Sequence, residues 1–186
     1  MPVSAMQRVN NVVVERLKQT EDSFRRDLAS ARRQQVLEGE WVLGDGAPQF
    51  RAFITYEGGK TTFEMDNPTF MGGDGALPGP MHYCFSGLAA CYTSTFAIVA
   101  AEKGILLRRL RVRVEATVNF SRVFGLADAP VMEEVHVQLE IDSPASDAEL
   151  QEVEELALQR CPVVWTLTHS VPLRSSWRRY AAAEAA

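Results

Sequence analysis

Three cysteines are the residues of this chain best suited to chemistry, because a cysteine thiolate is both a nucleophile and a reductant. Cys84 and Cys91 lie seven residues apart in an apolar segment that reads as one helix, and Cys161 directly precedes a proline. Seven helical residues rise about 10.5 Å, whereas a disulfide needs Cα atoms within about 7 Å of each other. Only Cys161 is therefore placed so that folding could bring it to either of the other two. The competing interpretation is that each is a small residue of the core, as buried cysteines commonly are.

Cys91 lies about ten residues into its predicted helix, beyond the first turn in which the helix dipole acts. A reactive thiolate at that depth needs a neighbouring cation. The other candidates for chemistry are weaker. His82, His136 and His169 show no metal-ligand spacing and no Cys-x-x-Cys pair is present, so no metal site is predicted. The glycine-rich run 72–75 lacks the Lys-Ser/Thr of a phosphate loop and reads as a turn.

Composition limits the classes of function. The 186 residues suffice for one domain with a sizeable core, and 46% hydrophobic with 23% charged residues is ordinary for a globular protein. A formal net charge of -5 argues against a nucleic-acid partner. The basic residues of 108–113 alternate with apolar ones, which favours a solvated strand face.

No secretory signal is recognisable in residues 1–20, which are charged throughout. The longest apolar stretch, residues 85–101, is interrupted by Ser86, Thr93 and Ser94 and is shorter than a typical membrane span. We therefore expect no membrane partner and a cytoplasmic location, where thiols stay reduced unless they are catalytic or redox-sensing.

Hydrophobic periodicity predicts helices and strands in a mixed order. Residues 1–36 read as a helical arm that packs on the main body or on a second subunit. Gly58 and Gly59 indicate a hairpin, Pro80 opens an apolar central helix that Gly104 closes, and Ser146 with Glu149 forms a capping box. The predicted strands are residues 41–43, 50–56, 60–65, 110–120, 135–141 and 171–177, and the predicted helices after the arm are 81–103 and 147–160.

Two runs in this order resemble a known family. Pro80 to Cys91 ends in Ser86-Gly87-Leu88-Ala89-Ala90-Cys91, and Leu156 to Val163 ends in Cys161-Pro162-Val163. They resemble the two cysteine motifs of the OsmC/Ohr family, and the likeness covers about residues 38–177. The resemblance implies an α+β fold, with two long central helices packed against bent, mostly antiparallel sheets in an intertwined homodimer. It divides the chain into a helical arm, 1–36, and an OsmC-like domain, 37–186.

The resemblance also implies a chemistry. Cys91 would attack a peroxide and become a sulfenic acid, Cys161 would resolve it as a disulfide, and an external dithiol would reduce that disulfide. An arginine on the early sheet would activate Cys91; Arg51 is the best match and Arg122 the other candidate. The implied function is thiol-dependent reduction of organic hydroperoxides, by a cysteine-based peroxidase with no cofactor.

The sequence departs from the family at Met81, where the organic-hydroperoxide branch has a glutamate that holds the arginine. Glu64 or Asp66 could replace it. Cys84 is an extra thiol to which the resemblance assigns no role. Two alternatives stay open. The chain could be a non-catalytic module that binds an apolar small molecule at the dimer interface, near Met65, Phe70, Met71 and Met81. It could also be a regulatory partner that docks through the N-terminal arm.

Overall fold

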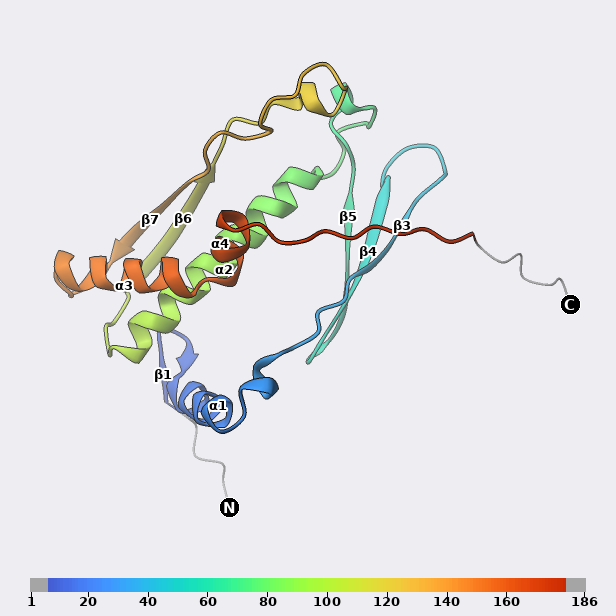
Figure 1. Ribbon diagram of the computed structural model, residues 1–186. Helices are drawn as coiled ribbons and strands as arrows, with labels where there is room; N and C mark the ends of the chain where they lie inside the picture. The colour runs from blue at the N-terminus through green and yellow to red at the C-terminus, as the bar shows by residue number, and fades with distance from the viewer. Residues whose placement is uncertain (1–6, 180–186) are drawn as a thin grey trace, which may run out of the picture.

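A 23-residue helix, α2 (Pro80–Glu102), runs through the centre of the computed structural model, which describes residues 7–179 (Figure 1). Pro80 occupies the first turn, where a missing N–H costs no hydrogen bond. Gly104 adopts φ +74° directly after the helix, a left-handed conformation that glycine reaches without strain. Both ends of the predicted central helix are thus confirmed within one residue.

The helix α2 supplies most of the hydrophobic core. It packs against α3 (Asp147–Arg160), α4 (Pro162–Thr168) and the strand β6 (Arg109–Glu115). The main cluster of buried residues comprises Tyr92, Phe96, Val99, Ala100, Val153, Ala157 and Cys161. By length and composition alone, α2 could cross a membrane. The expectation that its serine and threonine residues leave an apolar stretch shorter than a membrane span is therefore wrong. Here its role is that of a core helix.

Two antiparallel sheets lie on different sides of α2 (Figure 1). One is formed by β3 (Glu38–Trp41), β4 (Phe50–Tyr56) and β5 (Gly59–Met65). The predicted hairpin joins β4 to β5, with Tyr56 paired to Gly59. The other sheet consists of β6 and β7 (His136–Asp142), whose side chains alternate between half-buried and exposed, as the period of two predicted. The fold is therefore α+β with antiparallel sheets, as expected.

The segment before the first sheet differs from the predicted arm. Its helix, α1 (Val14–Arg26), is preceded by a small hairpin of β1 (Arg8–Val9) and β2 (Val12–Val13). Asn10 and Asn11 form the turn with φ +52° and +63°, a conformation in which asparagine is enriched. A continuous helix over residues 7–36 is therefore wrong, because two left-handed residues cannot continue it. The predicted helix over residues 1–6 lies outside the described part of the chain.

Three predicted strands also differ. The strand expected over 41–43 lies earlier, at Glu38–Trp41. The strand expected over 110–120 ends at Glu115, although half-buried and exposed residues go on alternating to Phe120. Residues 171–177 form no strand and have no partner within the described residues. Short 3-10 turns complete the fold at Leu28–Ala31, Thr69–Met71 and Phe120–Arg122.

Asn10 fastens the N-terminal hairpin to the turn that follows α2. Its amide nitrogen donates to the carbonyl of Ile105 and its amide oxygen accepts from the N–H of Leu107, both at 2.8 Å. Asn10→Gly keeps the backbone conformation and removes both bonds, so we expect it to lower the free energy of unfolding by about 1–3 kcal/mol. Chemical denaturation measures this change.

Asn11→Gly is the matched control, since Asn11 has a similar φ and bonds only to exposed Arg8. We expect it to leave the unfolding free energy within about 0.5 kcal/mol of the parent protein. Equal losses in both variants would show that the side chain of Asn10 does not hold the hairpin.

Candidate active site

Cys91 and Cys161 lie together at the junction of α2, α3 and α4. Their sulfur atoms are 3.6 Å apart, although the residues are separated by 70 positions in the chain. Cys91 is half-buried in the middle of α2, and Cys161 is fully buried in the core cluster. The structure therefore brings together the two cysteines of the resemblance and leaves Cys84 apart, exposed on α2.

Pro162 explains why Cys161 faces α2. A proline has no N–H and cannot continue α3, so that helix ends at Cys161, whose own N–H still bonds to the carbonyl of Ala157. The backbone of Cys161 is extended, with φ −70° and ψ 118°, and α4 starts immediately afterwards at Pro162. This turn between two helices directs the sulfur towards α2.

The pKa of the Cys91 thiol is set by opposing effects. Burial raises the pKa above its ordinary value, the backbone N–H of Val163 lowers it by hydrogen bonding to the thiolate, and the neighbouring Cys161 raises it again. Within the described residues, no Lys or Arg contributes to this pKa. In a single chain the thiol form of Cys91 is therefore favoured.

Tyr92 lies beside the thiols and stays neutral. Burial, together with the negative charges of Glu154 and Cys161, raises the pKa of Tyr92 to about 12. The residue is buried in the same core cluster as Cys161. Tyr92 therefore lines the site as a neutral phenol at physiological pH.

Arg51 lies on the other side of the fold, on β4. Its Nε donates to Glu64 Oε1 at 2.9 Å, and Glu40 Oε1 is 3.9 Å from the same guanidinium. Glu40, Arg51 and Glu64 stand directly opposite one another on three neighbouring strands. Of the two acids suggested by the sequence, Glu64 is thus the one that binds Arg51.

The guanidinium of Arg51 borders a cavity of about 640 Å³ together with Glu64, Leu77, Pro78 and Tyr83. Tyr83 precedes Cys91 by eight residues on α2, which corresponds to about 12 Å along the helix axis. Within one chain, Arg51 is therefore not part of the thiol pair's surroundings.

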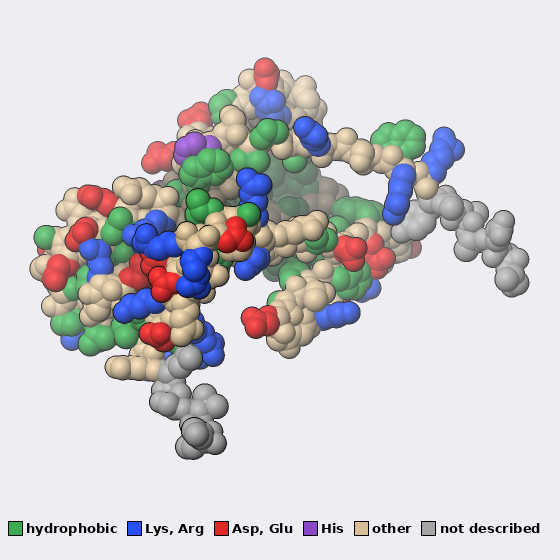
Figure 2. Space-filling model, turned by 60° about the horizontal axis from the view of Figure 1, so that its bottom comes forward, with side chains coloured by type: hydrophobic (Ala, Val, Ile, Leu, Met, Phe, Trp, Pro, Cys, Tyr) green, Lys and Arg blue, Asp and Glu red, His purple; other side chains and the backbone are tan. Residues whose placement is uncertain are grey.

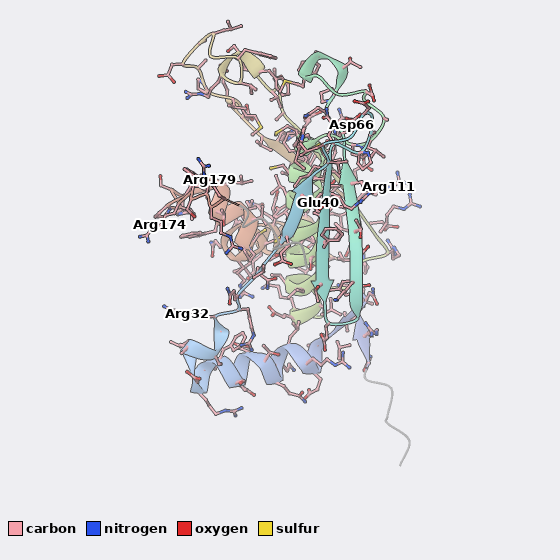
Figure 3. All side chains as sticks on the ribbon, turned by 90° about the vertical axis from the view of Figure 1, so that its right-hand side faces the viewer. Arg32, Glu40, Asp66, Arg111, Arg174 and Arg179 are labelled. Carbon is pink, nitrogen blue, oxygen red and sulfur yellow. The ribbon has the colours of Figure 1, made fainter. Side chains whose placement is uncertain are left out.

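The other sequence candidates have structural roles. Asp66 is buried and its Oδ2 accepts from the N–H groups of Asp74 and Ala76, so it holds the loop before α2 (Figure 3). Arg122 donates to the carbonyl of Ala129 and pairs with Asp128 within its own loop.

The three histidines bind neighbouring groups of the protein. His82 accepts from the N–H of Gly79, His136 pairs with Glu115 at 3.4 Å, and His169 stacks on Trp165. Residues 7–179 contain no cluster of three His, Cys, Asp or Glu side chains that could hold a metal.

Sequence reasoning missed the helix α4 and the contribution of Val163. Pro162 carried the signal for both, because proline favours the first position of a helix as well as the end of the preceding one. Since Pro162 has no N–H, the first N–H of α4 is that of Val163. That N–H is the backbone group that lowers the pKa of Cys91.

Two thiols lie in contact on an α+β scaffold, Cys91 half-buried and Cys161 fully buried, and this arrangement suits dithiol–disulfide chemistry. The family described as OsmC-like protein matches residues 73–176. The chain therefore belongs to the OsmC-like family. Both cysteines of the close pair fall within the matched segment.

Relatives agree with this assignment. The hydroperoxide reductase of Mycoplasma pneumoniae is 32% identical over 89 residues, which are 48% of this chain and 61% of the relative. The chain thus spans about three fifths of the length of this curated relative. The crystal structure of an OsmC-like protein from the same organism superposes with a TM-score of 0.56 at 22% identity, covering 73% of this chain and 88% of the other.

An organic hydroperoxide resistance protein, OsmC, from Legionella pneumophila superposes with a TM-score of 0.51 at 17% identity, covering 73% of this chain and 91% of the other. These structural similarities establish the OsmC/Ohr fold.

The contact between Cys91 and Cys161 predicts the product of mild oxidation. A disulfide needs the sulfurs to approach from 3.6 Å to about 2.05 Å, a small movement. We expect diamide to remove two free thiols per chain, with peptide mapping showing Cys91 joined to Cys161. The bond would stabilise the fold by about 4 kcal/mol in the chain-entropy estimate.

Cys84→Ser is the control and should form the same bond, whereas Cys161→Ser should not. A bond that contains Cys84, or one that joins two chains, would contradict the proximity of Cys91 and Cys161.

Proposed function

We propose that this protein reduces organic hydroperoxides with Cys91 and Cys161. The observation that carries the proposal is the 3.6 Å contact between the two sulfurs. A resolving thiol at this distance can trap an oxidised cysteine before further oxidation. The hydroperoxide reductase name of the Mycoplasma pneumoniae relative supports the substrate class.

The reaction balances with two protein thiols. The Cys91 thiolate attacks the outer oxygen of the hydroperoxide, the O–O bond breaks, and the alkoxide takes a proton and leaves as an alcohol. Cys91 is then a sulfenic acid. The Cys161 sulfur attacks it, the S–O bond breaks, and water leaves as the disulfide forms. An external dithiol reduces the disulfide by thiol exchange and restores both thiols.

The protein needs no metal or organic cofactor for this cycle, and its substrate is a small molecule in the cytoplasm. We do not assign a nucleic-acid or membrane partner. The net charge of -5 does not favour nucleic acid, and α2 lies against α3 and α4 as a core helix.

We also propose that the working form is a homodimer. Hydrophobic side chains are exposed in several places on the face shown in Figure 2. Large exposed ones in the described chain include Phe53, Trp165 and Trp177. Only a third of the most apolar stretch of α2 (33%) is buried. Exposed apolar surface of this extent is characteristic of protein interfaces.

A second copy would also complete the site. Burial opposes the Cys91 thiolate, and Arg51 lies on a sheet remote from Cys91 in its own chain. We propose that Arg51 from the second copy approaches Cys91, with Glu64 fixing its Nε so that its outer N–H groups point at thiolate and peroxide. Glu64 then holds the arginine, which the apolar side chain of Met81 cannot do.

The alternative of a non-catalytic binding module has less support. Met65 and Met71 are at least half-buried within one chain. Phe70 is largely exposed to solvent, and its ring makes an edge contact with Phe120. The close pair of thiols has no role in that function. A copurified apolar ligand together with unreactive cysteines would favour it.

Cumene hydroperoxide tests the proposed chemistry. The reduced protein should lose two thiols per chain and release one equivalent of cumyl alcohol. Cys161→Ser should stop at a sulfenic acid that dimedone traps. Cys91→Ser should lose its remaining thiols much more slowly than the parent protein does. Thiol loss at the parent rate would refute the role of Cys91.

Arg51 is tested by the pH dependence of Cys91 oxidation. A cation beside a thiol favours the thiolate and lowers its pKa, so Arg51→Ala should raise that pKa and move the rate profile to higher pH. We expect the rate at pH 7 to fall about tenfold or more. Arg122→Ala removes the rival arginine and should leave the profile unchanged. If Arg122→Ala shifts it instead, the assignment of Arg51 is wrong.

A further inference from the structure

The charges around Arg51 do not balance. Glu64 accepts a hydrogen bond from the Nε of Arg51 at 2.9 Å, and a carboxylate oxygen of Glu40 lies 3.9 Å from its Nη1. The three residues stand directly opposite one another on neighbouring strands, so their side chains share one face of the sheet. One guanidinium between two carboxylates leaves a negative charge in excess at neutral pH.

The cavity that Arg51 borders has apolar walls and no second cation. Apart from Arg51 and Glu64, the described residues that line it are uncharged: Thr62, Phe63, Leu77, Pro78 and Tyr83. The rings of Phe63 and Tyr83 contact each other, with centroids 4.6 Å apart. The hydroxyl of Tyr83 donates to the backbone carbonyl of Glu64, which fixes this aromatic wall beside the charged groups. The cavity therefore combines apolar contact surface with a negative electrostatic potential.

Glu40 is the source of the excess charge. The hydrogen bond between Glu64 and Arg51 pairs one carboxylate with the guanidinium, so their charges largely cancel at a distance. Glu40, at 3.9 Å, lies beyond hydrogen-bonding distance of the guanidinium. Its side chain is 60% exposed, so its field reaches the solvent in front of the sheet and is screened by salt.

We propose that this excess charge makes the site select uncharged hydroperoxides, with Glu40 as the specificity-determining residue. A hydroperoxide with an ionised carboxylate near its O–O bond would approach Arg51 against the charge of Glu40. A neutral hydroperoxide meets no such barrier and places its apolar group on Phe63 and Tyr83. The proposal names the substrate class of the function proposed above and rests on it.

Two derivatives of cumene hydroperoxide measure the selection. One carries a para carboxylate and the other is its methyl ester, which has a similar shape and electron-withdrawing group but no charge. In the parent protein, kcat/KM for the ester should exceed that for the acid about tenfold at low ionic strength, and added salt should reduce this ratio. Glu40→Gln should lower the ratio about fivefold. The ratio cancels any effect of the substitution on Cys91, because both peroxides meet the same thiolate.

Glu57→Gln is the matched control. Glu57 is also an exposed acid, but it lies in the turn of the β4–β5 hairpin, six residues from Arg51 along the chain. Six extended residues span about 20 Å, which is beyond the screening length at moderate salt. The control should leave the ratio within about twofold of the parent value. Equal use of the two peroxides by the parent protein, or equal effects of Glu40→Gln and Glu57→Gln, would overturn the proposal.

Binding of the two corresponding alcohols separates charge selection from the peroxide chemistry. In NMR titrations of the parent protein, the alcohol with the ester should bind more tightly than the alcohol with the carboxylate, and Glu40→Gln should narrow the difference. Charge selection among the alcohols without thiol loss to peroxide refutes only the proposed chemistry. Thiol loss without charge selection refutes only the role of Glu40, and the absence of both refutes both.

Discussion

Two sulfur atoms from segments 70 residues apart meet because a proline ends one helix and starts another. Without that break, α3 would continue and Cys161 would follow the helical rotation of its neighbours. The extended backbone of Cys161 instead joins two short helices that both pack on α2. The buried side chains Val153 and Ala157 fix α3 against α2, so the core itself determines where the second sulfur lies. The geometry of the thiol pair is thus a consequence of helix packing.

The same packing creates an electrostatic problem. A thiol buried enough to lie against its partner loses solvent that would stabilise its thiolate, and burial is the largest influence on the pKa of Cys91. The N–H of Val163 offsets part of this cost. A full positive charge would offset more, yet Arg51 is bound by Glu64 on another element. Proximity of the sulfurs and activation of the thiolate are therefore separate requirements, and the described part of one chain brings the sulfurs together but places no cation beside Cys91.

The sequence predicted most elements because their patterns are local. The capping box at Ser146 and the left-handed Gly104 depend only on neighbouring residues, and both are confirmed. The meeting of Cys91 with Cys161 could not be derived from spacing, since it depends on packing between helices; the family resemblance supplied it. The N-terminal helix was overextended because polar Asn10 and Asn11 are compatible with a helical period, and only their backbone angles reveal a turn.

The strand expected at 171–177 is a case in which a local pattern did not predict the structure. Its residues alternate as in a half-buried strand, but the prediction is wrong, because a strand needs a partner and the described chain offers none where this segment runs. The homodimer proposed above would account together for the limited burial of α2, the free edge of β7 and the separation of Arg51 from Cys91. In the proposed dimer, each is a surface or charge that the second copy would complement. A partner that supplied only one of these complements would leave the others exposed, which is why a second copy, with the same set of surfaces, is the most economical completion of the fold.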